Sequence, residues 1–361
     1  TLGGTGASSA ERVTLAKEVW QGDLLGAYHT LDTALEALVG YAEANRKNEA
    51  VALVGQRAQT VRDDAAKIVD PDRNQVTWVE VRPRSVSVGA SPIDLGALFR
   101  DAVVERVGAV VLTSATLSTD KGFGFLRARL GLDDRITVPL DELKVPSPFD
   151  YPQTSLLYTP RDLPETSDPS FTARAADRIA ELIAITGGGA FVLCTSVRSM
   201  RALCAALRGR TPLPPLLQGD APKLMLLRRF RAEKNAVLVA TMSFWEGVDV
   251  PGEALRLVVI DKIPFAVPTD PVVAARTAAI EAAGQNPFTA YSVPQAAITL
   301  KQGFGRLIRS RNDRGIVAIL DRRIRTRGYG KTLLESLPPA RRTDDLAAVA
   351  SFWAEITAAR S

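Results

Sequence analysis

The chain has 361 residues, of which 46% are hydrophobic, and a formal net charge of +5. This length and composition are typical of a globular protein with two to three domains. No apolar run reaches membrane-spanning length and the start lacks a signal-peptide core, so we expect a cytoplasmic protein. Cys194 and Cys204 are the only cysteines and His29 is the only histidine, which argues against a disulfide framework, a metal site and histidine-based catalysis.

The positive charge is concentrated in one segment. Residues 301–331 contain ten Lys or Arg and two Asp, a net charge of +8, so the rest of the chain carries −3 of the total of +5. A localised basic face suggests a polyanionic ligand such as a nucleotide or nucleic acid, and a solvated basic surface is the alternative.

The first part of the chain, from residue 10 to residue 69, has a helical pattern that ends at Asp70-Pro71-Asp72. We expect a helical segment over residues 1–74 that carries no chemistry. Two apolar rows are predicted to pack helix on helix. The first row contains Leu31, Leu35 and Leu38, and the second contains Val54, Ala58, Val61, Ala65 and Ile68.

Next come a predicted strand at 76–81, a predicted helix at 95–106 and a short apolar run at 109–112. The apolar run is typical of a buried parallel strand. Ser114 and Thr116 follow its C-terminal end, where open α/β sheets bind ligands. Their hydroxyl groups could relay hydrogen bonds from a phosphate site to a neighbouring domain, and an ordinary turn is the alternative.

A proline-rich stretch at 144–152 predicts a linker into a second domain. Apolar strands at 190–194, 236–240, 255–261 and 316–320 then alternate with helical segments. Strands separated by helices in this way predict an α/β fold with a parallel sheet covered on both faces.

The run from Gln302 to Arg309 combines residue types that suit a nucleotide's phosphates. Arg306 and Arg309 are spaced to share one helical face. Arginine offers planar, permanently charged donors for phosphate oxygens. Gly303 permits close approach of a backbone or phosphate, and Gln302 offers a donor and an acceptor. A basic helix face paired with local carboxylates is the alternative.

This run resembles motif VI of superfamily 2 helicases, and its form is most like the DinG branch of the XPD-like DNA helicases. Residues 112–117 resemble motif III, 191–196 motif IV and 241–249 motif V, in the expected order. The resemblance implies three parts of the chain. They are the remnant of a helical arch insert at 1–74, the end of a first RecA-like domain at 75–143 and a second RecA-like domain at 144–361. A simple helical subdomain is the alternative for the first part.

The resemblance also implies a function. Such helicases are ATP-dependent, need Mg²⁺, act on single-stranded DNA with 5′-to-3′ polarity and serve DNA repair or replication. The alternative is a non-catalytic nucleic-acid-binding module that keeps the RecA-like fold.

By the same resemblance, Arg306, Arg309 and Gln302 act on the γ-phosphate of ATP, with Arg309 favoured as the arginine finger. Residues Gly303, Glu246, Gly247 and Asp249 are expected to line the nucleotide cleft.

A second set of residues is expected on the DNA side. Ser196 and Arg198 follow the motif IV strand, where a helix N-terminus would add its dipole to phosphate contacts. Trp245 could stack on an exposed base, or be a core residue beside Phe244. Ser114 and Thr116 complete the residues predicted for DNA binding or coupling.

The phosphate-binding loop and the carboxylate box of ATPases are missing from the chain. Gly330-Lys331-Thr332 is the only Gly-Lys-Thr, and Arg325 stands where the first glycine of a phosphate loop is required. We therefore expect Lys331 to be a decoy and the chain to be part of a longer helicase, with a degenerate partner subunit as the alternative. We also expect the chain alone not to hydrolyse ATP.

Overall fold

A computed structural model describes residues 12–82, 84–119, 122–133, 139–245, 250 and 252–358. The chain forms two compact units. The first contains the described parts of 1–110, 128–135 and 266–287, and the second those of 111–127, 136–265 and 288–361. The domain boundaries expected at residues 74 and 143 concern the helicase resemblance and stay a prediction.

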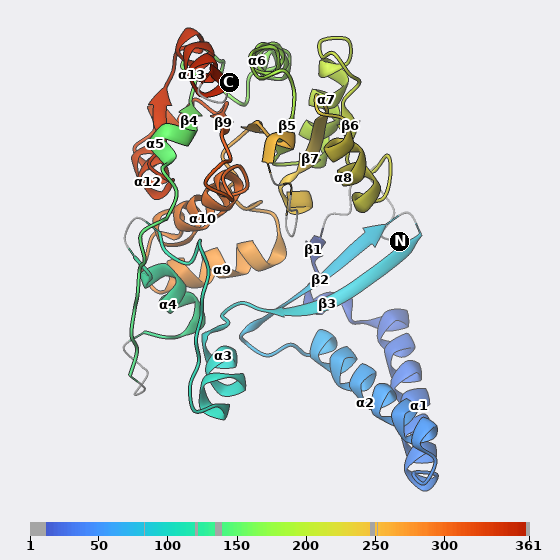
Figure 1. Cartoon of the computed structure of the whole chain (residues 1–361). Coiled ribbons are helices and arrows are strands. Elements are labelled where there is room, and N and C mark those ends of the chain that lie inside the picture. The colour runs from blue at the N-terminus through green and yellow to red at the C-terminus, as the bar shows by residue number, and fades with distance from the viewer. Residues whose placement is uncertain are drawn as a thin grey trace. The chain divides into compact units, whose positions relative to one another are not determined.

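A helical hairpin forms much of the first unit, as the sequence predicted, but the helical pattern expected from residue 10 is wrong at its start, where residues 12–14 form a strand. Helix α1 spans Gly22–Ala44 and α2 spans Glu49–Val69 (Figure 1). The side chain of Asn48 caps α2 by accepting hydrogen bonds from the amides of Ala50 and Val51. The two helices approach closely where Gly55 faces Ala42, because a Cβ on Gly55 would lie 2.5 Å from the Cβ of Ala42.

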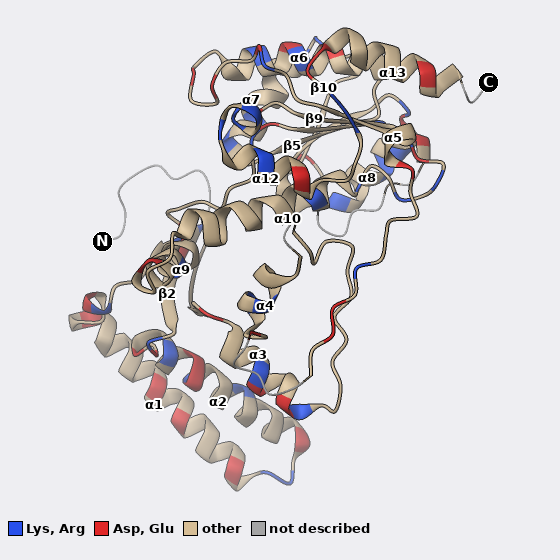
Figure 2. Cartoon of the chain, turned by 90° about the vertical axis from the view of Figure 1, so that its left-hand side faces the viewer, with Lys and Arg blue, Asp and Glu red and all other residues tan. Residues whose placement is uncertain are grey.

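The apolar row predicted on α2 is only partly correct. Ala58 is buried, but Val54 and Val61 are 46% and 49% exposed. Gly55 and Arg62 occupy the inner face instead. Arg62 forms ion pairs at 2.8 and 3.3 Å with Asp32 and Glu36 of α1, a helix that carries acidic residues and no Lys or Arg (Figure 2). The contact between the helices is therefore made by Gly55, which allows close approach, and by Arg62, which reaches the carboxylates of α1, and not by Val54 and Val61.

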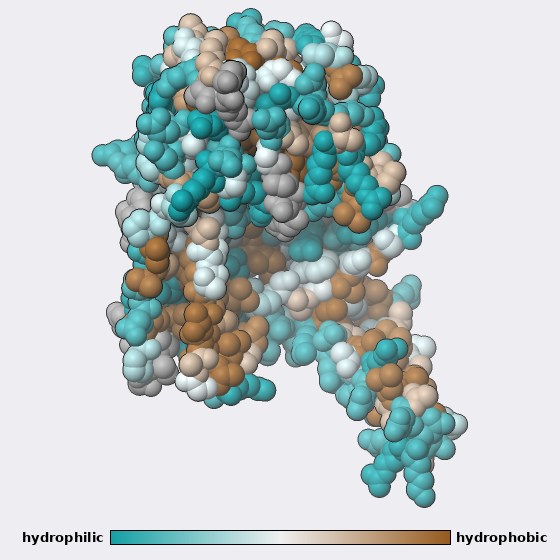
Figure 3. Space-filling view, in the orientation of Figure 1, coloured by the Kyte–Doolittle hydropathy of each residue, from teal (hydrophilic) through white to brown (hydrophobic). Residues whose placement is uncertain are grey.

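The row predicted on α1 is also partly wrong, because Leu31 and Leu38 are exposed and only Leu35 is half-buried. Apolar side chains therefore remain visible on the outside of the hairpin (Figure 3). The exposed row on α1 repeats at heptad spacing and contains Leu24, Ala27, Leu31, Ala34, Leu38 and Tyr41.

The rest of the first unit contains a three-stranded antiparallel sheet in the order β1-β2-β3. Its strands are β1 (Arg12–Thr14), β2 (Gln75–Arg82) and β3 (Ser85–Pro92), so the strand predicted at 76–81 is confirmed. Helix α3 (Gly96–Ala102) and the 3-10 turn η2 (Val104–Arg106) match the predicted helix at 95–106, and α9 spans Pro271–Ala282.

The buried strand predicted at 109–112 is wrong. The segment is not a strand, and Val111 is 86% exposed. A parallel strand needs a hydrogen-bonded neighbour on at least one side. Every described strand is paired elsewhere, so the apolar run alone did not produce a strand.

The second unit is built on a seven-stranded sheet in the order β10-β4-β9-β8-β5-β7-β6, and every described pair of strands is parallel. This confirms the predicted α/β class. The strands are β4 (Ser155–Tyr158), β5 (Ala190–Cys194), β6 (Leu216–Leu217), β7 (Val237–Thr241), β8 (Leu257–Ile260), β9 (Gly315–Ile319) and β10 (Arg341–Thr343).

Helices cover both faces of this sheet (Figure 1). Alternate strand residues point to opposite faces, so each strand contributes to two separate apolar cores. One face packs against α6 (Phe171–Thr186), α7 (Val197–Leu207) and α13 (Leu346–Ala358). The other packs against α8 (Lys223–Ala232), α10 (Val293–Phe304) and α12 (Tyr329–Ser336).

Short elements complete the described chain. They are η1 (Lys17–Val19), α4 (Gly124–Leu130), α5 (Tyr151–Thr154), η3 (Met242–Trp245), η4 (Gly252–Ala254), η5 (Phe288–Ser292) and α11 (Arg323–Thr326). Among the described helices, none has the length and apolar character needed to cross a bilayer.

Candidate functional site

The run that resembles motif VI lies at the end of α10, and its geometry corrects one prediction. The helix ends at Phe304, so Arg306 lies in a turn and Arg309 in an irregular loop. The two arginines therefore do not share a helical face. The loop amides of Arg309 and Ser310 bond to a side chain, Asp313, in place of helical carbonyl groups.

Asp313 is the residue that organises this motif VI loop. Its buried carboxylate accepts hydrogen bonds from the amides of Arg309 at 2.8 Å and Ser310 at 2.7 Å. Its second oxygen accepts from the amide of Gly252 at 3.2 Å, in the segment that follows motif V. Burial lowers the pKa of the Arg309 guanidinium, and the charge of Asp313 opposes that shift. Sequence reasoning missed Asp313, because its carboxylate accepts from amides that precede it in the chain and from the remote Gly252, which no local turn pattern predicts.

Gln302 and Gly303 lie in the last turn of α10 with different surroundings. Gln302 is exposed, whereas Gly303 is buried against the sheet. A Cβ on Gly303 would lie 3.3 Å from Cδ1 of Ile260, so this glycine allows α10 to pack closely on β8. Its predicted place in a nucleotide cleft stays a prediction.

The motif III segment contacts the same helix. Lys301 of α10 donates from Nζ to the backbone oxygen of Ser118 at 3.1 Å and to its hydroxyl at 3.3 Å. Burial lowers the pKa of the Lys301 ammonium, and nearby Lys144 adds to the shift. Within the segment, the Ser114 hydroxyl accepts from the amide of Thr116 at 3.2 Å. Lys301, just before the motif VI run, therefore contacts Ser118, just after motif III, across 183 residues of the chain.

The motif IV residues lie at a helix N-terminus, as predicted. Ser196 is the N-cap of α7 and accepts from the amide of Ser199 at 3.1 Å, while Ser196 and Arg198 are both exposed. Behind them, buried Asp261 accepts from the amide of Thr195 at 3.0 Å and the hydroxyl of Ser199 at 2.5 Å. Burial raises the pKa of the Asp261 carboxyl, and these hydrogen bonds oppose the shift.

Motif V begins at the end of β7. The amide of Thr241 donates to the side-chain oxygen of Gln218 at 2.7 Å. Phe244 is buried in the core, with the ammonium of Lys223 5.2 Å from its ring centre. Trp245 is the last residue of η3, and its side chain lies outside the described part of the structure, as do Glu246, Gly247 and Asp249 in full. Their predicted roles stay predictions.

A second buried carboxylate, Asp321, follows β9. It accepts from the amide of Ile263 at 2.9 Å and from Nη2 of Arg323 at 2.6 Å. The hydrogen bond to Asp321 raises the pKa of the Arg323 guanidinium. Asp261 and Asp321 thus tie together the loops that leave β5, β8 and β9.

Lys331 is exposed on a helix, and its role as a decoy stays a prediction. It lies on α12 with its side chain 82% exposed and its Nζ 3.8 Å from Glu335, one helical turn away. A Cβ on Gly330 would collide with the carbonyl oxygen of Ile324, so the glycine serves packing between α11 and α12.

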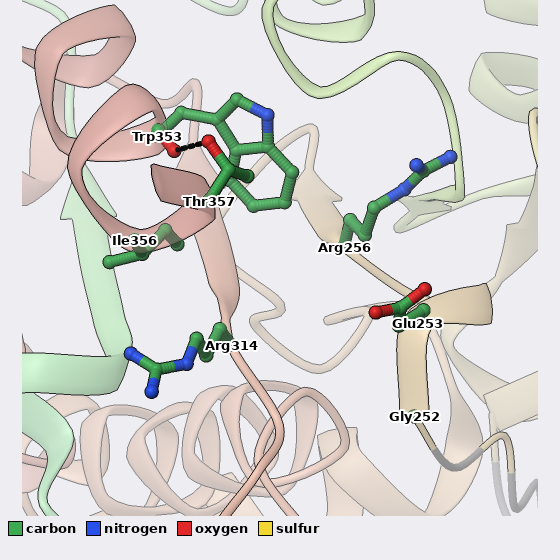
Figure 4. A pocket seen from close by; sticks show the side chains of 7 residues that line it. All are labelled: Gly252, Glu253, Arg256, Arg314, Trp353, Ile356 and Thr357. Carbon is green, nitrogen blue, oxygen red and sulfur yellow. Dashed lines mark hydrogen bonds between the residues drawn. The ribbon is translucent and has the colours of Figure 1, made fainter. Parts of the chain in front are cut away.

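A small cavity of about 180 Å³ lies where α13 meets the loops at the amino ends of the strands (Figure 4). Thr357 donates to the backbone oxygen of Trp353 at its wall, at 2.8 Å. Arg256 extends over its edge and donates to the backbone oxygen of Gly187 at 3.0 Å. None of the predicted site residues lines this cavity.

Comparisons with known proteins agree with the motif pattern. The helicase C-terminal domain family matches residues 179–340. The chain is 42% identical over 277 residues to the ATP-dependent DNA helicase YoaA of Escherichia coli K12, covering 77% of this chain and 43% of the relative. It is 40% identical over 274 residues to the ATP-dependent helicase DinG of Mycobacterium tuberculosis H37Rv, covering 74% of this chain and 41% of the relative.

A solved structure titled "XPD_APO" has the same fold, with a TM-score of 0.59, 15% identity and coverage of 93% of this chain and 65% of that one. The chain spans less than half the length of the curated relatives described above.

Proposed function

Because this chain corresponds to the C-terminal portion of a DinG-like helicase, we propose that it is the C-terminal motor part of an ATP-dependent DNA helicase. In this role it couples ATP hydrolysis to 5′-to-3′ movement along single-stranded DNA, in the cytoplasm, during repair or replication. The observation that carries the proposal is Asp313, whose carboxylate joins the motif VI loop to the segment after motif V.

Arg306 and Arg309 are the residues that act on ATP in this proposal. ATP is held by a first RecA-like domain, whose end we assign to residues 75–143, and the arginines of residues 144–361 approach its γ-phosphate. Phosphoryl transfer places charge on the equatorial oxygens, and a guanidinium that meets this charge contributes about 10³–10⁵ in rate.

Asp313 positions Arg309 by accepting a hydrogen bond from its backbone amide, and in the proposal the Arg309 guanidinium contacts phosphate. Gln302, Gly303, Glu246, Gly247 and Asp249 complete the proposed nucleotide side. The described residues contain no group of three His, Cys, Asp or Glu side chains arranged to hold a metal ion. In the proposal, Mg²⁺ accompanies ATP on the phosphate-loop half of the helicase.

Coupling to DNA uses the other motifs. Ser196 and Arg198 contact backbone phosphates at the N-terminus of α7, where the helix dipole favours anions. Trp245 stacks on a base of the single-stranded DNA or lies beside the DNA strand. Ser114 and Thr116 transmit the state of the nucleotide site, through the Lys301–Ser118 contact, to α10.

The arginine assignment is tested in protein that contains this chain together with the phosphate-loop half. Arg309→Ala should nearly abolish ATP turnover and leave ATP binding and single-strand binding largely intact. Arg311→Ala, an exposed arginine of the same loop, is the matched control. Near-normal turnover in both Arg306→Ala and Arg309→Ala protein would show that this loop is only a basic surface.

The chain by itself should not hydrolyse ATP, because it has no phosphate loop and no carboxylate box. The assay is phosphate release with and without single-stranded DNA. Turnover by the chain alone would overturn this expectation and make Lys331 a candidate ligand.

A second candidate function is a nucleic-acid-binding module without catalysis, which the basic segment at 301–331 favours. It predicts single-strand binding but no ATP turnover even after the phosphate-loop half is restored. The two functions are therefore separated by the same turnover measurement.

A further inference from the structure

A basic cavity that none of the helicase motifs uses lies in the second unit. It has a volume of about 810 Å³ and is bordered by the loops and helices that follow β4 and β9, together with β10. Six of its lining residues are cations, namely Arg161, Arg322, Arg325, Arg327, Lys331 and Arg342. In parallel α/β sheets the carboxyl edge is where ligands bind.

Positive charge is in excess in this cavity. Asp344 pairs with Arg161 and, at 4.0 Å, with Arg325. Glu165 lies 3.4 Å from Arg322, and Glu335 lies 3.8 Å from Lys331. The ion pairs described for the six cations thus involve three carboxylates, so about half of the positive charge is not neutralised by these partners.

Two of the arginines are held in place by neutral groups. Arg325 donates from Nε to the backbone oxygen of Thr159 at 2.9 Å, and Arg342 donates from Nη2 to that of Leu334 at 2.7 Å. These bonds keep both guanidinium groups at the cavity wall without cancelling their charge. Like charges gathered in this way repel one another, and a polyanion relieves that repulsion.

The lining favours phosphate over an apolar ligand. Ile324 and Leu334 are the main apolar side chains among the lining residues, whereas small-molecule pockets are lined mostly by apolar groups. Arginine presents fork-shaped donors that match phosphate oxygens in pairs.

The cavity and the motif IV residues lie on one continuous edge of the sheet. Hydrogen bonds connect the loops that follow neighbouring strands along this edge. Asp261 after β8 accepts from the amide of Thr195 after β5, and Asp321 after β9 accepts from the amide of Ile263 after β8. Arg325, also after β9, donates to Thr159 after β4. Three strand spacings of about 4.8 Å separate β5 from β4, a distance of about 14 Å. A few nucleotides of a single strand span that distance.

We propose that this arginine cavity binds backbone phosphates of single-stranded DNA, and that it extends the strand-binding track from Ser196 and Arg198 along the carboxyl edge of the sheet. The inference rests on the proposed function, because it takes DNA as the polyanion. Contacts of this kind are independent of base sequence and weaken as salt is added.

The test uses the whole 361-residue chain and a fluorescently labelled oligothymidylate, with anisotropy measured over a range of salt concentrations. Arg327→Glu/Lys331→Glu changes two exposed side chains of the cavity. We expect affinity at low salt to fall by about tenfold or more and the log–log salt slope to shrink by about 1.4, which is about 0.7 for each lost contact.

Arg228→Glu/Lys234→Glu is the matched control, since it makes the same charge change at exposed positions on α8 and just after it, away from the cavity. Thermal melts confirm that both variants fold. An equal loss of affinity in the two variants would mean diffuse electrostatic attraction, and would overturn the proposal.

Ser196→Ala/Arg198→Ala separates this inference from the proposed function. If the unmodified chain does not bind the oligonucleotide, the proposed function fails and the cavity assignment fails with it. If binding depends on Ser196 and Arg198 but not on the cavity, only the cavity assignment fails. Inorganic triphosphate is the further probe: binding of triphosphate that the cavity variant loses, with DNA affinity unchanged, would assign the cavity to a free polyphosphate instead.

Discussion

Replacing Asp313 should lower the free energy of unfolding of the second unit. The loss should be larger than for an exposed carboxylate that also accepts hydrogen bonds from backbone amides. The Asp313 side chain is 4% exposed and accepts three amide hydrogen bonds, two of them below 2.9 Å. Hydrogen bonds to a charged group contribute about 1.5–3 kcal/mol each. Ser310 is exposed, so its amide regains a bond to water in the variant. Gly252 is exposed as well, so mainly the bond to the half-buried Arg309 amide is lost, and we expect Asp313→Ala to cost about 1.5–3 kcal/mol.

Asp313→Asn keeps the shape but replaces one acceptor oxygen with a donor. Either the Arg309 and Ser310 amides or the Gly252 amide then faces an NH₂ group, so the cost should be about 1–3 kcal/mol. The measurement is urea denaturation followed by circular dichroism, fitted with separate transitions for the two units.

Asp345→Ala is the control, because Asp345 is exposed and accepts two amide bonds at the start of α13. Loss of such a cap costs about 0.5–2 kcal/mol. If Asp313→Ala costs no more stability than Asp345→Ala, the buried Asp313 carboxylate does not hold the motif VI loop in place. In assembled helicase, Asp313→Ala should also lower ATP turnover while single-strand binding persists.

Three further predictions concern packing, pH and an aromatic side chain. A Cβ on Gly40 of α1 would meet no neighbouring atom, so Gly40→Ala should stabilise the hairpin by about 0.5–1 kcal/mol. Gly55→Ala should not stabilise it, because its new Cβ would collide with Ala42. Thermal melts of the two variants test this difference. Burial raises the pKa of Tyr158 to about 12, so the folded state keeps its phenol proton longer than the unfolded state. The resulting stability is complete below pH 10 and is lost toward pH 12, and Tyr158→Phe should abolish this loss in denaturation curves taken across that range. Trp245→Ala should weaken nucleic-acid coupling with little change in melting temperature, and a cost of about 3–5 kcal/mol would instead make it a core residue.

The sequence alone predicted four of the seven strands of the sheet and the order of the motifs, but not β4, β6 and β10. Continuous apolar strands such as Ala190–Cys194 and Gly315–Ile319 are buried on both faces, and their apolar runs between helical segments predicted them. Ser196 was recognisable as a helix start because the capping bond forms between residues three apart. These are local or periodic signals, which a sequence displays directly.

The tertiary structure decided what depends on distant partners. The apolar run at 109–112 has no neighbouring strand among the described residues and is exposed. The contact row of α2 passes through Gly55 and Arg62, because only the facing helix offers Ala42 and the carboxylates of Asp32 and Glu36.

The motif VI loop shows the same dependence. Its residue types are evident in the sequence, but α10 ends at Phe304 and Asp313 bonds the loop amides, so the two arginines leave the helix. The basic cavity is assembled from cations that lie up to 181 residues apart, between Arg161 and Arg342. The spacing of residues along the sequence does not predict these contacts. Hydrogen bonds and ion pairs between residues far apart in the chain form only when the folded sheet brings the carboxyl ends of its strands to one edge.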